Sequence, residues 1–376
     1  MRKKICFIVA TPITANAFLL KHFEYLAQEF DIYLVANFED NTKIKFSSPF
    51  VKEIKNVNIH RDISILKDFQ ALIKLRKYLK NNNFDAVHTV TPKAGLIGIL
   101  ASKLAGIKTR IHIFTGQVWH TKNGIFKTIL KNIDRFIVFC ATDILVDGHS
   151  QRQFLIQNNI IKESNSAVLG KGSISGVDTS KFIPNPVIKQ KYRDEFNFTN
   201  EVVFLFLGRL NIDKGVVDLA NAFLILNKEF PQSRLIFVGP DEENIQDKIT
   251  KLGVNNATII FYGATSNPQD VLQMADVFCL PSYREGFGTS VIEASLLKLP
   301  IICSDTYGLT ETILENNTGL RHKVKDVDSI LSQMRKMMNP DLRNKLGTNG
   351  RQYVLDNFSA EMISKEWLEF YKQKLS

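Results

Sequence analysis

Short runs of apolar residues recur along the whole 376-residue chain, and the spacers between them are long enough for one helix each. The runs are continuous rather than alternating, which is typical of strands covered by helices on both faces. Strands separated by helical spacers indicate parallel βαβ units, so the sequence predicts two doubly wound α/β domains. The expected strands are 4–10, 31–37, 86–90, 110–115 and 143–148 in the first half, and 202–208, 234–239, 258–263, 277–282 and 300–305 in the second.

The least regular part of the chain, 169–186, lies between the two series of runs and is rich in glycine and proline. Such a segment is the best candidate for a domain boundary. Near the end of the chain, Met362, Trp367 and Phe370 occur at helical spacing, which predicts a closing helix. We expect a first domain over 1–175, a second over 176–357, and a helix over 358–376 that packs back toward the first domain.

Charge is distributed unevenly between the two halves. The net charge is +10, but residues 1–190 hold 27 Lys and Arg against 14 Asp and Glu, whereas residues 191–376 hold 21 against 24. A basic first half indicates an anionic partner, which could be a nucleic acid, an acidic lipid surface or a phosphorylated substrate. A nucleic-acid binder should show base-stacking aromatics among its basic residues or a known binding motif, and neither is visible, so we expect no nucleic-acid partner.

We expect the chain to act in the cytoplasm. Its four cysteines, which form no CxxC pair, are expected to be small buried hydrophobic residues in a reducing compartment: Cys6, Cys140, Cys279 and Cys303. No stretch reaches the 18 or so apolar residues that a transmembrane helix needs. The uncharged segment 5–20 is interrupted by Pro12 and polar residues, which favours a buried strand and helix over a secretory signal.

Two loops at expected strand ends carry residues suited to binding a ligand, because ligands of doubly wound sheets lie beyond the carboxyl ends of the strands. In the first, Gly208 permits a tight exit, Arg209 offers a planar fork to phosphate oxygens, and Lys214 adds a charge just before a helix. This pattern indicates a phosphate site; the alternative is a solvated surface loop.

The second loop follows the run 277–282 and contains a Gly-Phe-Gly stretch next to Glu285. Glu293 comes eight residues later, two turns into the following helix. The two carboxylates could both accept hydrogen bonds from hydroxyls. The alternative is a glutamate that complements the helix dipole and a second one at the surface.

Three segments resemble the motifs of retaining glycosyltransferases with the GT-B fold, family 4 of the glycosyltransferase classification. They are SGVDTSKF at 175–182, GRLNIDKG at 208–215, and ADVFCLPSYREGFGTSVIEA at 275–294, which contains EGFG at 285–288 and the Glu-x7-Glu motif. The resemblance covers nearly the whole chain. It implies a GT-B fold, in which two Rossmann-like domains face each other across a cleft.

The same resemblance implies a role for each matched residue. Arg209 and Lys214 would hold the donor diphosphate, catalytic Glu285 would bind donor-sugar hydroxyls near the reacting carbon, and Glu293 would bind the ribose. The other donor-binding positions would be Gly208, Gly239, Gly263, Gly286, Phe287, Gly288 and Thr289. Two cations beside the diphosphate would stabilise the leaving group, a task that a metal performs in other transferases, so we expect neither a metal site nor a cofactor besides the nucleotide sugar.

The first half departs from the family at two strand exits. Residues 10–15, ATPITA, stand where many relatives have a glycine-rich loop, and Thr115-Gly116 stands where relatives often have His-Gly. His120 is therefore our second catalytic candidate, since it could reach the donor sugar from the same loop. His112 and His149 remain alternatives, and a plain surface role for His120 also remains open.

Two further patterns allow more than one interpretation. Asp326 and Asp328 have the Asp-x-Asp spacing of metal-dependent transferases, but their position favours charge at a helix N-terminus. The segment 122–135 is an amphipathic helix that could lie on an anionic membrane or pack on the sheet. Its basic residues are Lys122, Lys127, Lys131 and Arg135, and its apolar ones Ile125, Phe126, Ile129, Leu130 and Ile133.

Together these features resemble bacterial capsule, O-antigen and glycan-assembly transferases. The resemblance implies transfer of a sugar, an N-acetylhexosamine, from a UDP-sugar to a polyprenyl-diphosphate-linked or polysaccharide acceptor at the cytoplasmic face of the cell membrane. The alternative is a two-domain α/β ligand-binding protein without catalysis, which would have a cleavable signal and no need for Arg209, Lys214, Glu285 and Glu293 together. The sequence leaves the donor sugar, the linkage and the oligomeric state open.

Overall fold

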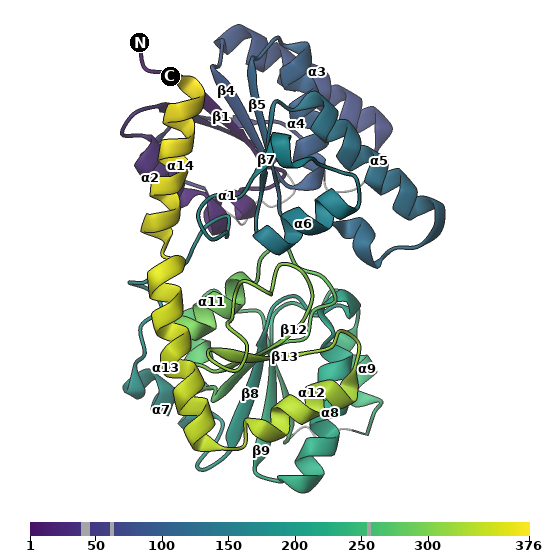
Figure 1. Cartoon of the computed structure of the whole chain (residues 1–376), viewed down its shortest axis with the longest axis vertical. Coiled ribbons are helices and arrows are strands. Elements are labelled where there is room, and N and C mark those ends of the chain that lie inside the picture. Colours follow the sequence, from purple (N-terminus) through teal and green to yellow (C-terminus); the bar gives the residue numbers. More distant parts are fainter. Residues whose placement is uncertain (39–45, 61–63, 254–256) are drawn as a thin grey trace. The chain divides into compact units, whose positions relative to one another are not determined.

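The chain forms two compact units, which we call unit 1 (Met1–Gly176 with Ala360–Ser376) and unit 2 (Val177–Ser359). The computed structural model describes residues 1–38, 46–60, 64–253 and 257–376. In each unit a parallel sheet is covered by helices on both faces (Figure 1). The molecule is thus built from two Rossmann-like α/β domains.

The sheet of unit 1 has the strand order β3-β2-β1-β4-β5-β6-β7. Its strands are β1 Lys4–Ile8, β2 Asp31–Ala36, β3 Val51–Asn56, β4 Ala86–Val90, β5 Thr109–Phe114, β6 Asp143–Val146 and β7 Ser166–Ala167. Helices α3 Ile65–Asn82, α4 Pro92–Leu104 and α5 Gly124–Cys140 cover one face, and α1 Pro12–Phe18, α2 Leu20–Leu26 and α14 Ala360–Leu375 cover the other. The remaining short helices are η1 Val118–Thr121, α6 His149–Gln157 and η2 Glu163–Asn165.

Strand β1 shows why the apolar runs are continuous. Ile5 and Phe7 belong to the core beneath α2 and α14, whereas Cys6 and Ile8 belong to the core beneath α3 and α4. Successive side chains of a strand point to opposite faces of the sheet, so a strand with helices on both sides needs apolar residues at every position. All four cysteines of the chain are buried and unbridged.

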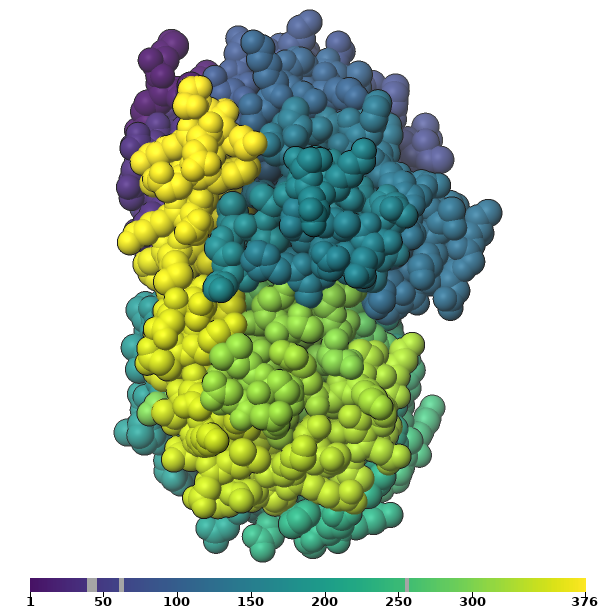
Figure 2. All heavy atoms as spheres, viewed as in Figure 1, coloured from purple at the N-terminus to yellow at the C-terminus, as the bar shows by residue number. Residues whose placement is uncertain are grey.

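The last helix of the chain packs on the first unit through an aromatic stack. Trp367 of α14 lies between two buried histidines, with ring centroids 4.2 Å from His22 and 4.8 Å from His88. Ser364 and Tyr371 of the same helix reach those histidines with contacts of 2.9 Å and 2.6 Å. Figure 2 shows the yellow atoms of α14 over this side of unit 1. The two ends of the chain therefore share one core.

The sheet of unit 2 has the strand order β10-β9-β8-β11-β12-β13. Its strands are β8 Val202–Leu207, β9 Ser233–Val238, β10 Ile259–Gly263, β11 Val277–Leu280, β12 Ile301–Ser304 and β13 Gly319–His322. Helices α8 Val216–Glu229, α9 Ile245–Thr250 and α12 Val327–Lys336 pack together, and α11 Thr289–Leu296 packs on α13 Pro340–Asn357. The others are α7 Pro186–Glu195, η3 Ile212–Lys214, α10 Pro268–Val271 and η4 Leu272–Met274.

All ten expected strands are present, and three further strands were not expected: β3, β7 and β13. Strands β3, β7 and β13 each lie at an edge of a sheet. Strand β3, VKEIKN, is largely exposed and carries three charged residues. An edge strand needs no continuous apolar run, because part of its surface faces water.

Candidate functional site

The loops 208–215 and 281–288 leave the sheet of unit 2 at the same point. Strands β8 and β11 are neighbours, and the strand order reverses between them. In doubly wound folds this reversal opens a crevice at the carboxyl ends of the strands, where ligands bind. The two loops that carry the sequence candidates are thus side by side at the expected edge.

Lys214 and Glu285 form an ion pair between the two loops. The Nζ atom of Lys214 lies 2.5 Å from Oε1 of Glu285, and the Ser282 hydroxyl donates to the same oxygen at 2.7 Å. Gly215 makes this approach possible: its φ is +66°, and a Cβ atom there would lie 2.1 Å from the carbonyl oxygen of Pro281. The pair is mostly buried, with side chains 18% and 12% exposed, so its charges interact in a partly dry environment.

Arg209 is engaged by a carboxylate that sequence reasoning missed. Its Nη1 atom donates to both oxygens of Glu242, at 3.2 Å and 3.0 Å, and Asn211 donates to one of them at 3.0 Å. Gly239 lets the exits of β8 and β9 approach, since a Cβ atom there would lie 1.8 Å from the carbonyl oxygen of Gly208. Because β9 is the neighbour of β8, the acidic residues after Gly239 were the signal that could have identified Glu242.

The loop 281–288 is held by hydrogen bonds from the next strand and from loop 208–215. The hydroxyl of Ser304 donates to the carbonyl of Ser282, and that of Thr306 to the carbonyl of Tyr283. Arg284 donates to Asp213 in the other loop at 2.9 Å. These contacts fix the backbone on either side of Glu285, which a site needs in order to position its functional groups.

Of the four backbone amides expected to face a ligand, two are used within the protein. Gly288 N–H donates to the carbonyl of Gly308, and Thr289 N–H donates to that of Phe287. The N–H groups of Gly286 and Phe287 make no hydrogen bond to any residue that the structure describes. The Phe287 ring is buried and packs against Phe358, so only its backbone is available to a ligand.

Glu293 lies on α11, below the loop, and is partly buried. Burial raises the pKa of its carboxyl to about 7, against the opposing effect of the Lys181 charge. Within the described parts of the chain its carboxylate has no hydrogen-bond partner. A carboxyl group of this kind can accept a hydrogen bond from a hydroxyl or donate one. Gly263, a further candidate, ends β10 with a φ of +85°.

The histidine candidates all lie in unit 1 and differ in environment. His120 is in η1, partly exposed, with its ring edge-on to Phe154 at 4.9 Å. His149 is exposed at the start of α6, where Nε2 lies 3.2 Å from the carbonyl oxygen of Gly170. His112 is a core residue of β5: it is bonded to Thr89, and burial lowers its pKa to about 3. Its inaccessibility removes His112 as a candidate.

The Asp-x-Asp pair has a structural explanation. Asp326 caps α12 by accepting the Ser329 N–H at 2.8 Å, and Asp328 lies in the first turn of that helix. Among the described residues no group of three or more His, Cys, Asp or Glu side chains could hold a metal ion. In the same residues, no helix has the length and apolar character needed to span a bilayer.

Comparison with known proteins identifies the two units. A family model described as "Glycosyl transferase 4-like" matches residues 4–145, and one described as "Glycosyl transferases group 1" matches residues 188–353. The capsular polysaccharide biosynthesis glycosyltransferase CapM of Staphylococcus aureus is 29% identical over 99% of this chain and 97% of its own length. UDP-Gal:alpha-D-GlcNAc-diphosphoundecaprenol alpha-1,3-galactosyltransferase of Escherichia coli is 28% identical over 90% of this chain and 88% of its own.

Solved structures share the fold. Sucrose-phosphate synthase from Thermosynechococcus elongatus superposes with a TM-score of 0.82 and 20% identity, covering 99% of both chains. Anabaena Alr3699/HepE in complex with UDP and glucose superposes with a TM-score of 0.80 and 17% identity, covering 98% of this chain and 99% of that one. The chain belongs to the glycosyltransferases of the GT-B fold, in family 4 of the glycosyltransferase classification.

Proposed function

We propose that the protein is a retaining transferase that moves an N-acetylhexosamine from a UDP-sugar to a polyprenyl-diphosphate-linked saccharide. The observation that carries the donor assignment is the ion pair of Lys214 and Glu285 at the switch point of unit 2, with Arg209 in the same loop as Lys214. Two cations here can bind a diphosphate, and a carboxylate beside them can bind sugar hydroxyls.

In the proposed reaction the bond between the anomeric carbon and the diphosphate oxygen breaks, and the oxygen takes the electron pair. An acceptor hydroxyl bonds to the same carbon and loses its proton, and UDP departs. Arg209 and Lys214 stabilise the negative charge that grows on the leaving diphosphate. Glu285, which contacts Lys214 in the structure, would face the donor sugar, where its charge favours the positive character that develops at the anomeric carbon.

The acceptor is inferred from the relatives. The Escherichia coli relative acts, by its name, on a GlcNAc-diphosphoundecaprenol. A Campylobacter jejuni relative, 28% identical over 82% of this chain and 81% of its own, is named an N,N'-diacetylbacillosaminyl-diphospho-undecaprenol alpha-1,3-N-acetylgalactosaminyltransferase. A donor with an N-acetylhexosamine and an acceptor on a polyprenyl diphosphate suit surface-polysaccharide assembly.

The surface of α5 supports work at the inner face of the membrane. Ile125, Phe126 and Ile129 point outward, with exposed fractions of 80%, 45% and 48%. An apolar row exposed on a helix that carries Lys127, with Lys122 just before its start, suits contact with an anionic bilayer, while the buried face of the same helix packs on the protein. Helix α3 adds a second exposed apolar row: Ile65, Leu66, Phe69 and Ile73.

A nucleotide-release assay tests the proposal. The purified chain is given a panel of UDP-, GDP- and dTDP-sugars with a short polyprenyl-diphosphate N-acetylhexosamine as the acceptor. We expect acceptor-dependent release of UDP from a UDP-N-acetylhexosamine, and a product with the anomeric configuration of the donor. Release from GDP- or dTDP-sugars alone, or inversion at the anomeric carbon, would contradict the donor or the mechanism respectively.

A further inference from the structure

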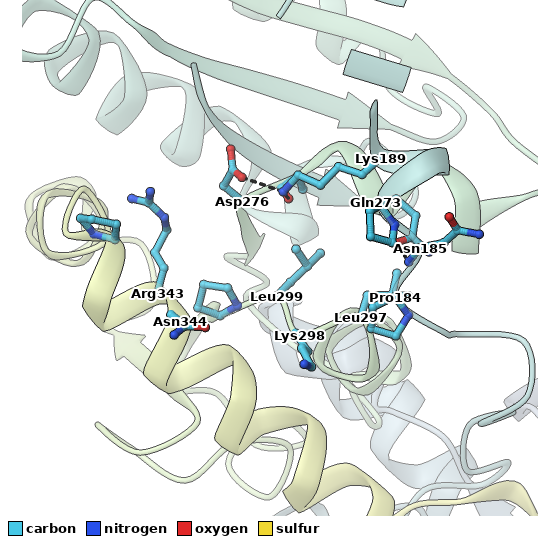
Figure 3. Close-up of a pocket in the computed structure, with 14 residues that line it drawn as sticks. Pro184, Asn185, Lys189, Gln273, Asp276, Leu297, Lys298, Leu299, Arg343 and Asn344 are labelled. Carbon is cyan, nitrogen blue, oxygen red and sulfur yellow. Dashed lines mark hydrogen bonds and ion pairs between the residues drawn. The ribbon is translucent and has the colours of Figure 1, made fainter. Parts of the chain in front are cut away.

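A cavity of about 360 Å³ lies in unit 2, at the amino ends of β11 and β12 (Figure 3). Asp276 and Pro300, which line it, directly precede these two strands. The candidate donor site lies at the carboxyl ends of β8 and β11, and the cavity lies at the opposite, amino ends of the strands of the same sheet. The cavity is therefore separate from the donor site, and its volume is within the range of small-molecule pockets.

The cavity carries more positive than negative charge. Lys189, Lys298, Arg343 and one carboxylate, Asp276, line it. The Asp276 carboxylate is already satisfied by Lys189 at 2.9 Å, by Arg193 at 3.1 Å, and by a backbone N–H. For Lys298 and Arg343 the described part of the chain offers no carboxylate within ion-pair distance. An anion is what this set of charges lacks.

Arg343 has N–H donors that no described residue uses. Its Nη1 atom donates to the carbonyls of Met337 and Met338, at 2.6 Å and 3.1 Å, and its other nitrogens contact no acceptor among the described residues. Burial lowers the pKa of this guanidinium, partly offset by the charge of Asp276. In Figure 3 the guanidinium and the Lys189 amine lie on either side of the Asp276 carboxylate. An anion bound here would restore the stabilisation that the guanidinium loses to desolvation.

The backbone holds Lys298 and Arg343 at the same cavity. Lys298 ends the turn after α11 in the left-handed conformation, with φ +62°. A Cβ atom on Gly347 would lie 2.0 Å from the carbonyl oxygen of Lys298, so α13 approaches this turn as closely as a glycine allows. Arg343 is one turn before Gly347 on the same side of α13. The close approach of α13 therefore brings its guanidinium to the turn.

The rest of the lining is mostly apolar. Leu297, Leu299 and four prolines, Pro184, Pro186, Pro300 and Pro340, line the cavity together with the cations. A free inorganic anion would leave these surfaces uncovered, whereas an anion with a compact organic body would cover them. We propose that this cavity binds a small organic phosphate, held by Arg343 with Lys189 and Lys298 and covered by the leucine and proline side chains.

Calorimetric titration of the full chain, saturated with UDP to fill the donor site, tests the proposal. The probes are glucose 1-phosphate, inorganic phosphate and glucose. We expect glucose 1-phosphate to bind more tightly than inorganic phosphate and glucose not to bind. Arg343→Gln should weaken binding about tenfold or more, because charge-assisted hydrogen bonds are lost. Lys345→Gln, an exposed charge change on the same helix outside the cavity, should leave binding unchanged.

Arg343 also holds backbone carbonyls, so a second variant keeps the test independent of folding. Asn344→Trp fills the cavity from an exposed position without removing a charge, and it should abolish binding. The proposal is overturned if glucose 1-phosphate fails to bind the UDP-saturated chain, or binds no better than inorganic phosphate. It is also overturned if Asn344→Trp leaves the affinity intact, or if Lys345→Gln reduces it as much as Arg343→Gln. None of these outcomes depends on transferase activity, so the proposed function is tested separately.

Discussion

Glu285 and Glu293 belong to one sequence motif, but the structure gives them different surroundings. Glu285 is paired with Lys214 in the loop, whereas Glu293 lies on α11 with a carboxyl pKa raised to about 7 by burial. Glu285 lies in the loop four residues before α11 begins, whereas Glu293 lies about one turn into that helix and not two turns as the sequence suggested. We therefore expect their roles in the reaction to separate.

Glu285→Gln should reduce the rate of transfer at least about 100-fold and leave UDP affinity almost unchanged, because the amide keeps the shape but loses the charge felt in the transition state. Glu293→Gln, the matched variant, should chiefly raise the Michaelis constant for the donor. Steady-state kinetics paired with UDP titration measures both effects. If Glu285 governed affinity and Glu293 the rate, the nucleotide would lie in the reverse direction along α11.

Glu242 accepts hydrogen bonds from the guanidinium of Arg209, which we propose binds the diphosphate. The pair is 45% and 34% exposed, so it is worth at most about 1 kcal/mol. Glu242→Gln should therefore raise UDP affinity, by up to about fivefold, because Arg209 is released and a negative charge near the phosphates is removed. Calorimetric titration with UDP measures the change.

Glu243→Gln is the control for this prediction, since Glu243 accepts the Ile212 N–H at 3.0 Å and does not contact Arg209. Glu243→Gln should leave UDP affinity unchanged. Weaker binding in Glu242→Gln would show that Glu242 positions Arg209 for the ligand instead of competing with it.

At the scale of the elements, the sequence predicted what local chemistry determines. Continuous apolar runs marked ten of the thirteen described strands, and the glycines at 208, 239 and 263 marked strand exits. The edge strands β3, β7 and β13 were not predicted, because β3 is largely exposed, β7 has only two residues, and β13 contains an arginine and a histidine. The ion pairs of the site could not be predicted: Lys214 and Glu285 are 71 residues apart, and Arg209 and Glu242 are 33 apart.

Helix α5 was the element whose environment the sequence left open. Its row of Ile125, Phe126 and Ile129 is exposed, but its basic residues divide into two groups. Lys131 donates to Asn158, and Arg135 donates to Asn132 and to the Asn159 carbonyl. Lys127, and Lys122 just before the helix, have no such partners among the described residues. These two lysines should therefore contribute most to attraction by an anionic surface.

Changing Lys122 and Lys127 to Gln should reduce sedimentation with anionic liposomes at low salt, since each basic residue near such a surface contributes about 1 kcal/mol. Changing Ile125 and Phe126 to Ser should also reduce the binding that persists at high salt, where charge is screened. Neither double variant should alter UDP affinity. Lys131→Gln with Arg135→Gln is the matched control and should have the smaller effect. Equal binding to neutral liposomes would contradict the electrostatic part of the prediction.

At the scale of the whole molecule, the last helix of the chain packs against residues near the N-terminus in unit 1. The sequence predicted a final helix that includes Trp367, but not the partners of that side chain. His22 and Ser364, which are in contact at 2.9 Å, are 342 residues apart, and no local pattern could relate them. Long-range polar contacts of this kind follow from the packed fold, whereas the helix itself follows from local spacing.

The histidines around Trp367 should make the stability of unit 1 depend on pH. Burial lowers the pKa of His22 from 6.5 to about 4, despite its contact with the Ile174 carbonyl, and lowers that of the neighbouring His88 well below 6.5. Above pH 6.5 His22 is neutral in both the folded and the unfolded chain, so its contribution to stability does not change with pH. As the pH falls from 6.5 to 4, His22 binds a proton in the unfolded chain but not in the folded chain. The free energy of unfolding therefore decreases across this pH range. The loss for His22 alone is about 3 kcal/mol.

Urea unfolding followed by tryptophan fluorescence measures this effect in unit 1, because both tryptophans of the chain, Trp119 and Trp367, belong to that unit. The His22→Gln variant should be less stable than the wild type above pH 6.5, and its unfolding free energy should fall less steeply between pH 6.5 and 4. His149→Gln, a change at an exposed position, should follow the wild-type curve. Carboxyl groups elsewhere titrate equally in all three proteins, so the difference between the curves isolates His22. If the wild-type and His22→Gln curves run parallel down to pH 4, the buried histidine is protonated in the folded state and the prediction is wrong.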